Sequence, residues 1–130
     1  MDNRLKKISL DLRKMTSGQA ADWLMTNYPI EDPNYWEVFQ LISHVSWKRA
    51  DQNRLAKKYL KKMPFASSKA YEVFASFMSF ELFVKAIREQ FPIDKENLDL
   101  LLYHLCPVLE KAAKSDSDRE LMRSLIAELT

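Results

Sequence analysis

Trp36-Glu37-Val38-Phe39 has a near copy at Tyr71-Glu72-Val73-Phe74, 35 residues further along the chain. In both copies an aromatic residue precedes the triplet Glu-Val-Phe, and apolar residues with the spacing of a helix follow it. A recurrence at this distance matches the length of one helix–turn–helix repeat. The pattern therefore favours stacked pairs of helices, an architecture that typically binds partners along an extended surface.

Apolar residues recur at the spacing of one helix face along the whole chain. We expect a helix boundary near Ser46, a helix that begins at Asp32-Pro33 and a last helix capped by Ser117. Pro107 either kinks a helix or starts a new one. The sequence thus predicts an all-α protein with seven or eight helices in antiparallel pairs, forming a single domain over residues 1–130.

Shifting the segment 34–63 by one repeat length places it on 69–91, and a second shift places it on Pro107-Val108-Leu109 followed by 117–129. This layout resembles that of HEAT-like helical repeat proteins. The resemblance covers nearly the whole chain and is carried by spacing and apolar pattern, so no functional residue is transferred from it. It implies an α-α superhelix, while a compact helical bundle is the alternative that fits the same pattern.

The composition excludes several classes of protein. Hydrophobic residues make up 47% of the 130 residues and charged residues 29%, which argues against disorder. Gly18 is the only glycine, whereas sheets with tight turns usually need several. The lone Cys106 cannot form an internal disulfide, and no stretch reads as a signal peptide or a membrane span. We therefore expect a cytoplasmic protein that does not enter membranes.

Charge is unevenly distributed along the chain. Residues 1–64 hold 12 Lys and Arg against 7 Asp and Glu, a net charge of +5, and residues 65–130 hold 8 against 11, a net charge of −3. Much of the positive charge falls on one amphipathic segment, 48–62. A solvated helix face that keeps the chain soluble is the simplest interpretation of such a cluster. The functional interpretation is an anion-binding surface.

Trp47 is expected to be exposed beside these cations, because it falls on their side of the helical projection. The alternative is a helix boundary that turns the Trp47 ring inward. An exposed Trp next to Arg and Lys is typical of binding hot spots. The predicted partner-binding residues are Trp47, Lys48, Arg49, Arg54, Lys57, Lys58, Lys61 and Lys62. The predicted partner is an acidic protein, and the alternative is the backbone of a nucleic acid bound through the basic helix 48–62.

No pattern in the chain predicts catalysis, a metal or a cofactor. His104 and Cys106 are two positions apart, so their side chains diverge on a continuous helix. The acidic residues gather at expected helix starts, where they interact favourably with the helix dipole. We therefore expect a non-enzymatic protein-binding module, such as an adaptor or a stoichiometric inhibitor, of which a bacterial toxin-immunity protein is one concrete form. An enzyme would require titratable groups that converge from different helices.

Overall fold

The computed structural model describes residues 1–130 and contains eight α-helices, two short 3₁₀ helices and no strand. The predicted all-α fold class is confirmed, and the count of eight α-helices falls within the predicted seven or eight. The chain divides into two compact units, Met1–Tyr59 and Leu60–Thr130. That residues 1–130 form a single domain therefore stays a prediction. Each unit is described by itself below.

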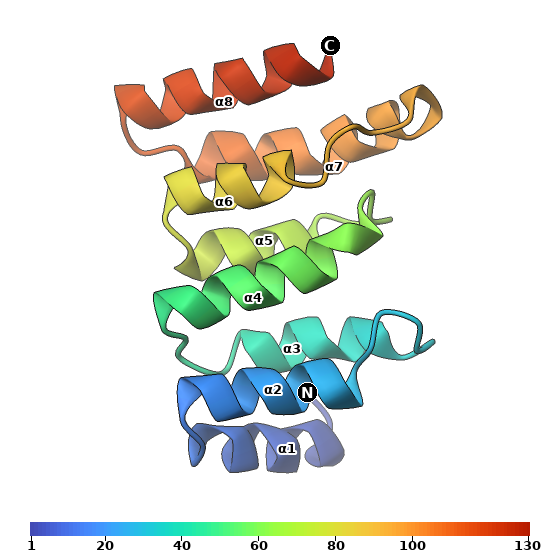
Figure 1. Ribbon diagram of the computed structural model, residues 1–130, viewed down its shortest axis with the longest axis vertical. Coiled ribbons are helices and arrows are strands. Elements are labelled where there is room, and N and C mark those ends of the chain that lie inside the picture. The colour runs from blue at the N-terminus through green and yellow to red at the C-terminus, as the bar shows by residue number, and fades with distance from the viewer. The chain divides into compact units, whose positions relative to one another are not determined.

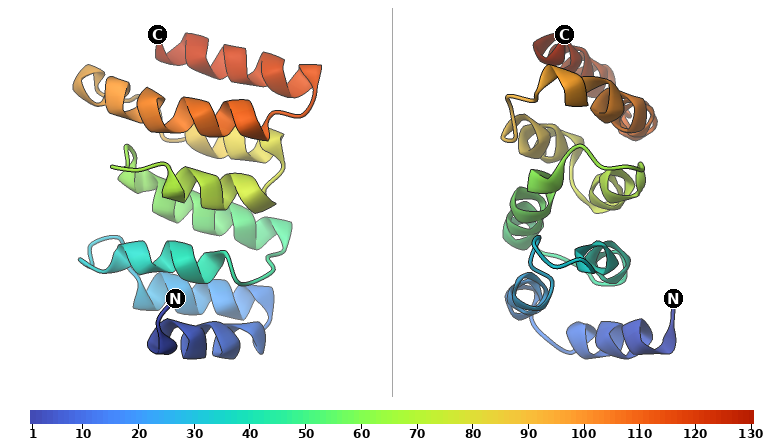
Figure 2. Two further views of the ribbon diagram at one scale, coloured as in Figure 1. Left: turned by 180° about the vertical axis from the view of Figure 1, so that it is seen from behind. Right: turned by 90° about the vertical axis from the view of Figure 1, so that its right-hand side faces the viewer.

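The first unit consists of two helix pairs in two layers. Helices α1 and α3 lie in one layer and α2 and α4 in the other, and consecutive helices run in opposite directions (Figures 1 and 2). Their bounds are α1 Asn3–Arg13, α2 Ser17–Asn27, η1 Tyr35–Glu37, α3 Val38–Ile42 and α4 Arg49–Tyr59.

The helix starts follow local capping chemistry. Thr16 accepts a hydrogen bond from the backbone amide of Gln19, and the Gln19 side chain accepts one from the Thr16 amide, which completes a capping box. The Asp2 carboxylate caps α1 by accepting a single hydrogen bond from the amide of Leu5. These side chains satisfy amides that have no partner within the helix, and so they set where α1 and α2 begin.

Apolar side chains from both layers close the core of the first unit. The buried ones include Leu5, Leu12, Leu24, Leu41, Ile42, Leu55 and Tyr59. The buried Tyr59 hydroxyl lies 2.8 Å from the carbonyl oxygen of Tyr28 and 3.2 Å from that of Leu24, and it donates its hydrogen to this pair. Burial raises the pKa of Tyr59, so the hydroxyl stays protonated as this donor.

The second unit has the same layered plan. Helices α5 and α7 lie in one layer and α6 and α8 in the other (Figure 2). The bounds are η2 Leu60–Lys62, α5 Lys69–Phe77, α6 Phe80–Arg88, α7 Lys95–Ala112 and α8 Asp116–Leu129. The core includes Tyr71, Phe74, Phe83, Ile87, Leu101, Leu105, Leu109 and Leu125. Burial raises the pKa of Tyr71 to about 12, and its hydroxyl accepts a hydrogen bond from the Phe65 amide.

Two expected helix starts are wrong, and Pro107 does not start a new helix. Asp32 caps no helix: its carboxylate accepts from the amide of Asn34 in a local turn, and the regular helix begins only at Val38. Ser115, not Ser117, caps α8, because its hydroxyl accepts from the amide of Asp118. Pro107 lies inside the continuous helix α7.

Candidate functional site

The predicted basic residues lie on two elements. Lys48 directly precedes α4, and Arg49, Arg54, Lys57 and Lys58 lie on it, in the first unit. All are exposed except Lys58, which is half-buried. Lys61 and Lys62 are also exposed, but they lie on η2 and belong to the second unit. The first unit therefore presents a smaller basic surface than the sequence segment suggested.

Arg54 links two helices of the first unit. Its guanidinium forms an ion pair with Asp22 on α2 and a second one, at 2.9 Å, with Asp51 on its own helix. The hydrogen bond from the Ser17 hydroxyl is the larger effect on the pKa of Asp51, and the one from Arg54 is smaller. Together they hold this pKa below its ordinary value despite the burial of the carboxylate. Because two carboxylates already neutralise Arg54, it is a poor ligand for a further anion.

Trp47 is buried, so the expectation of an exposed hot-spot ring is wrong. Only 8% of its surface is accessible, and its indole Nε1 donates a hydrogen bond of 3.0 Å to the carbonyl oxygen of Ile42. The Gln52 side chain in turn donates to the Trp47 carbonyl. Trp47 lies in the connection before α4, and its ring therefore does not follow the helical projection that predicted its exposure.

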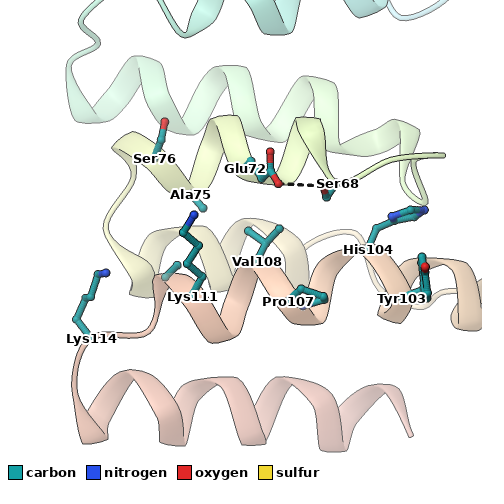
Figure 3. A pocket seen from close by; sticks show the side chains of 11 residues that line it. Ser68, Glu72, Ala75, Ser76, Tyr103, His104, Pro107, Val108, Lys111 and Lys114 are labelled. Atoms are coloured by element: carbon teal, nitrogen blue, oxygen red, sulfur yellow. Dashed lines mark hydrogen bonds between the residues drawn. The ribbon is translucent and has the colours of Figure 1, made fainter.

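A groove with a volume of about 840 Å³ runs over α5 and α7 in the second unit (Figure 3). We call it the α5–α7 groove. Its walls are formed by Ser68, Glu72, Ala75, Ser76, Tyr103, His104, Pro107, Val108, Lys111, Ala112 and Lys114. None of these residues was predicted as a site residue. The groove exists because α5 and α7 pack side by side although they lie about thirty residues apart in the chain.

Each wall of the groove is a stripe of residues four apart in sequence. Ser68, the N-cap residue of α5, forms one stripe with Glu72 and Ser76 on the helix. Tyr103, Pro107 and Lys111 form the stripe on α7. Residues four apart share a helix face, so the α7 stripe is visible in the sequence beside the apolar arc of Leu101 and Leu105. Nothing in the sequence shows that the two stripes face one groove.

The groove has chemically different ends. Tyr103, with 75% of its surface exposed, lies at one end, and its ring contacts that of His104 edge to face at a centroid distance of 4.9 Å. Lys111 and Lys114 lie towards the other end (Figure 3). The Glu72 carboxylate lies between them and accepts a hydrogen bond of 2.9 Å from the Ser68 hydroxyl. The groove therefore offers an aromatic surface at one end and two ammonium groups at the other.

Pro107 changes the backbone chemistry of the groove. A proline has no amide hydrogen, so the carbonyl of Tyr103 lacks the donor that position 107 supplies in an ordinary helix. Both residues line the groove, and both are exposed. This carbonyl is thus a candidate acceptor for a hydrogen bond from a bound molecule.

No group of three or more His, Cys, Asp or Glu side chains is arranged to hold a metal ion. None of the helices combines the length and apolar character needed to cross a membrane. Comparison with known proteins finds no matching family model, no matching curated protein and no matching solved structure. The resemblance to HEAT-like repeats therefore stays a prediction from the sequence pattern.

Proposed function

We propose that this chain is a non-enzymatic protein-binding module and that the α5–α7 groove is its binding surface. The observation that carries the proposal is the exposed Tyr103 ring at one end of the groove, opposite Lys111 and Lys114 at the other. Tyr is among the residues that most often anchor a protein interface. Charged groups at the edge of such a site mainly steer the partner and raise the association rate.

Binding fits the groove better than catalysis does. The titratable groups on its walls are Glu72, His104, Lys111, Lys114 and the Tyr103 hydroxyl. Glu72 is engaged by Ser68, and the His104 ring packs against Tyr103 and points away from the Glu72 carboxylate (Figure 3). An acid–base pair needs its members within hydrogen-bond reach of one reacting group. An adaptor or a stoichiometric inhibitor, such as a toxin-immunity protein, is the functional form that we favour.

Site-specific photocrosslinking tests this proposal. A photoreactive phenylalanine analogue replaces Tyr103 in one version of the chain and the exposed Arg123 of α8 in the matched control. Both are expressed in the native cells and irradiated. We expect a discrete protein adduct from position 103 and none from position 123. Equal adducts from both positions, or none from position 103, would contradict a binding role for the groove.

Nucleic-acid backbone binding through the basic helix is the second candidate. It is favoured by the exposure of Lys48, just before α4, and of Arg49 and Lys57 on α4, all in the first unit. Three phosphate contacts, one for each of Lys48, Arg49 and Lys58, predict that log K falls with log salt at a slope of about −3.

Electrophoretic or polarisation assays with a 20-base-pair duplex at several salt concentrations test this candidate. The double variant Lys48→Glu, Arg49→Glu is compared with the control Lys6→Glu, Lys85→Glu, which makes the same change of charge at exposed lysines on α1 and α6. Loss of binding in the first variant alone supports the candidate. Absence of duplex binding by the unmodified chain, or equal loss in both variants, eliminates it.

A further inference from the structure

We infer that the occupant of the α5–α7 groove is a short, extended, acidic peptide segment of the partner protein. The segment runs along α7 with its carboxylates at Lys111 and Lys114 and an aromatic or proline side chain on the Tyr103 ring. This inference rests on the proposed function and adds to it the chemistry and the direction of the partner segment.

The charges on the walls set the direction. Lys111 and Lys114 are exposed, and neither takes part in an ion pair within the chain. The only carboxylate on the walls is that of Glu72, nearer the middle of the groove. A peptide with its acidic residues at the lysine end gains attraction there. The reverse orientation loses this attraction, because no Lys or Arg lines the groove at the Tyr103 end.

The middle and the far end of the groove suit an uncharged part of the same segment. Val108 is buried in the groove floor, and Pro107 and Tyr103 continue the apolar surface. The Tyr103 carbonyl, which receives no hydrogen bond from position 107, can accept one from a peptide amide. From Tyr103 to Lys111 the helix rises about 12 Å at 1.5 Å per residue, which about four extended residues span.

The same features disfavour a nucleic-acid strand in this groove. A strand carries a phosphate at every nucleotide, so some phosphates would lie close to the Glu72 carboxylate. The two lysines at one end would neutralise only a small part of that charge. A peptide can concentrate its carboxylates at one end, and therefore it matches the uneven charge of the walls.

An array of random octapeptides probed with the full chain tests the inference. We expect the bound peptides to be enriched in Asp and Glu at one end and in aromatic residues or proline at the other. The strongest binder is then synthesised with a fluorophore, together with a version in which Asn and Gln replace its Asp and Glu. Fluorescence polarisation should show binding at least tenfold weaker for the amide version.

Variants of the chain assign the effect to the groove. The double variant Lys111→Glu, Lys114→Glu should weaken binding of the acidic peptide at least tenfold, whereas Lys6→Glu, Lys85→Glu, with the same charge change outside the groove, should leave it within about twofold. Tyr103→Ala should weaken both the acidic peptide and its amide version. Circular dichroism confirms that each variant is folded.

Two outcomes would overturn the inference. One is an array without acidic enrichment, or equal binding of the acidic and amide peptides. The other is binding of a 12-nucleotide single strand that is lost in Lys111→Glu, Lys114→Glu, when no acidic peptide binds. If either occurs while position 103 still crosslinks to a protein, the proposed function stands and only the partner chemistry is wrong. If position 103 yields no protein adduct either, both fail.

Discussion

The Ser17 hydroxyl donates a hydrogen bond of 2.7 Å to the Asp51 carboxylate and thereby joins the first turn of α2 to the first turn of α4. The same hydroxyl oxygen accepts from the amide of Lys48 at 3.0 Å, just before α4 begins. Arg54 binds the second oxygen of Asp51 at 2.9 Å. One buried carboxylate thus connects two helices that the chain separates by about thirty residues.

Replacing Asp51 with Ala should lower the free energy of unfolding by about 1–3 kcal/mol, because Ser17 and Arg54 each lose a charged hydrogen-bond partner at a buried position. Urea denaturation followed by circular dichroism measures the loss. Asn53→Ala, on the exposed face of the same helix, is the control and should stay within about 0.5 kcal/mol of the unmodified chain. Equal stability of Asp51→Ala and the control would show that the link between α2 and α4 contributes nothing.

The stability contributed by Asp51 should depend on pH. Its pKa in the folded chain lies below its ordinary value, because Ser17 and Arg54 stabilise the ionised form. The contribution is therefore fully present above about pH 4 and is lost as the pH falls through the folded pKa. The difference in unfolding free energy between the unmodified chain and Asp51→Asn should be constant from pH 5 to 7 and shrink towards pH 3. A difference that grows on acidification would reverse the assigned direction of the shift.

Tyr59→Phe should cost about 1–3 kcal/mol of unfolding free energy. The variant keeps the buried ring but removes the hydroxyl that satisfies the carbonyls of Leu24 and Tyr28 at the C-terminal end of α2. Thermal and urea denaturation measure the effect. Tyr103→Phe removes an exposed hydroxyl by the same change and should be nearly neutral. If the two variants have the same stability, the Tyr59 hydroxyl has no role in holding α4 against α2.

Pro107→Ala should make the chain more stable, by about 1–3 kcal/mol. The alanine restores an amide that can donate to the Tyr103 carbonyl, and it relieves the clash of the proline ring with that carbonyl inside α7. A higher midpoint of urea denaturation with unchanged helical circular dichroism is the expected result. Glu110→Ala, at another exposed position of α7, provides the comparison for a change that leaves the backbone bonding intact. A loss of stability in Pro107→Ala would mean that the proline is favourable where it stands.

The sequence alone determined that the protein is all-α with seven or eight helices, and it located most of them. Apolar residues spaced at the helical period and caps such as Thr16 act over a few residues, so their signal is complete within each segment. Even so, Asp32 and Ser117 were wrongly assigned as caps, because several nearby side chains can compete for the same amides.

Only the tertiary structure decided which side chains are available to a partner. It buried Trp47 against the Ile42 carbonyl, engaged Arg54 with two carboxylates, and brought the Ser68 and Tyr103 stripes together along one groove. Each of these outcomes depends on how helices or connections pack against one another, since a helical projection describes one helix and carries no information about its neighbour. Spacing along the chain therefore predicts the elements, and packing between elements sets the candidate site.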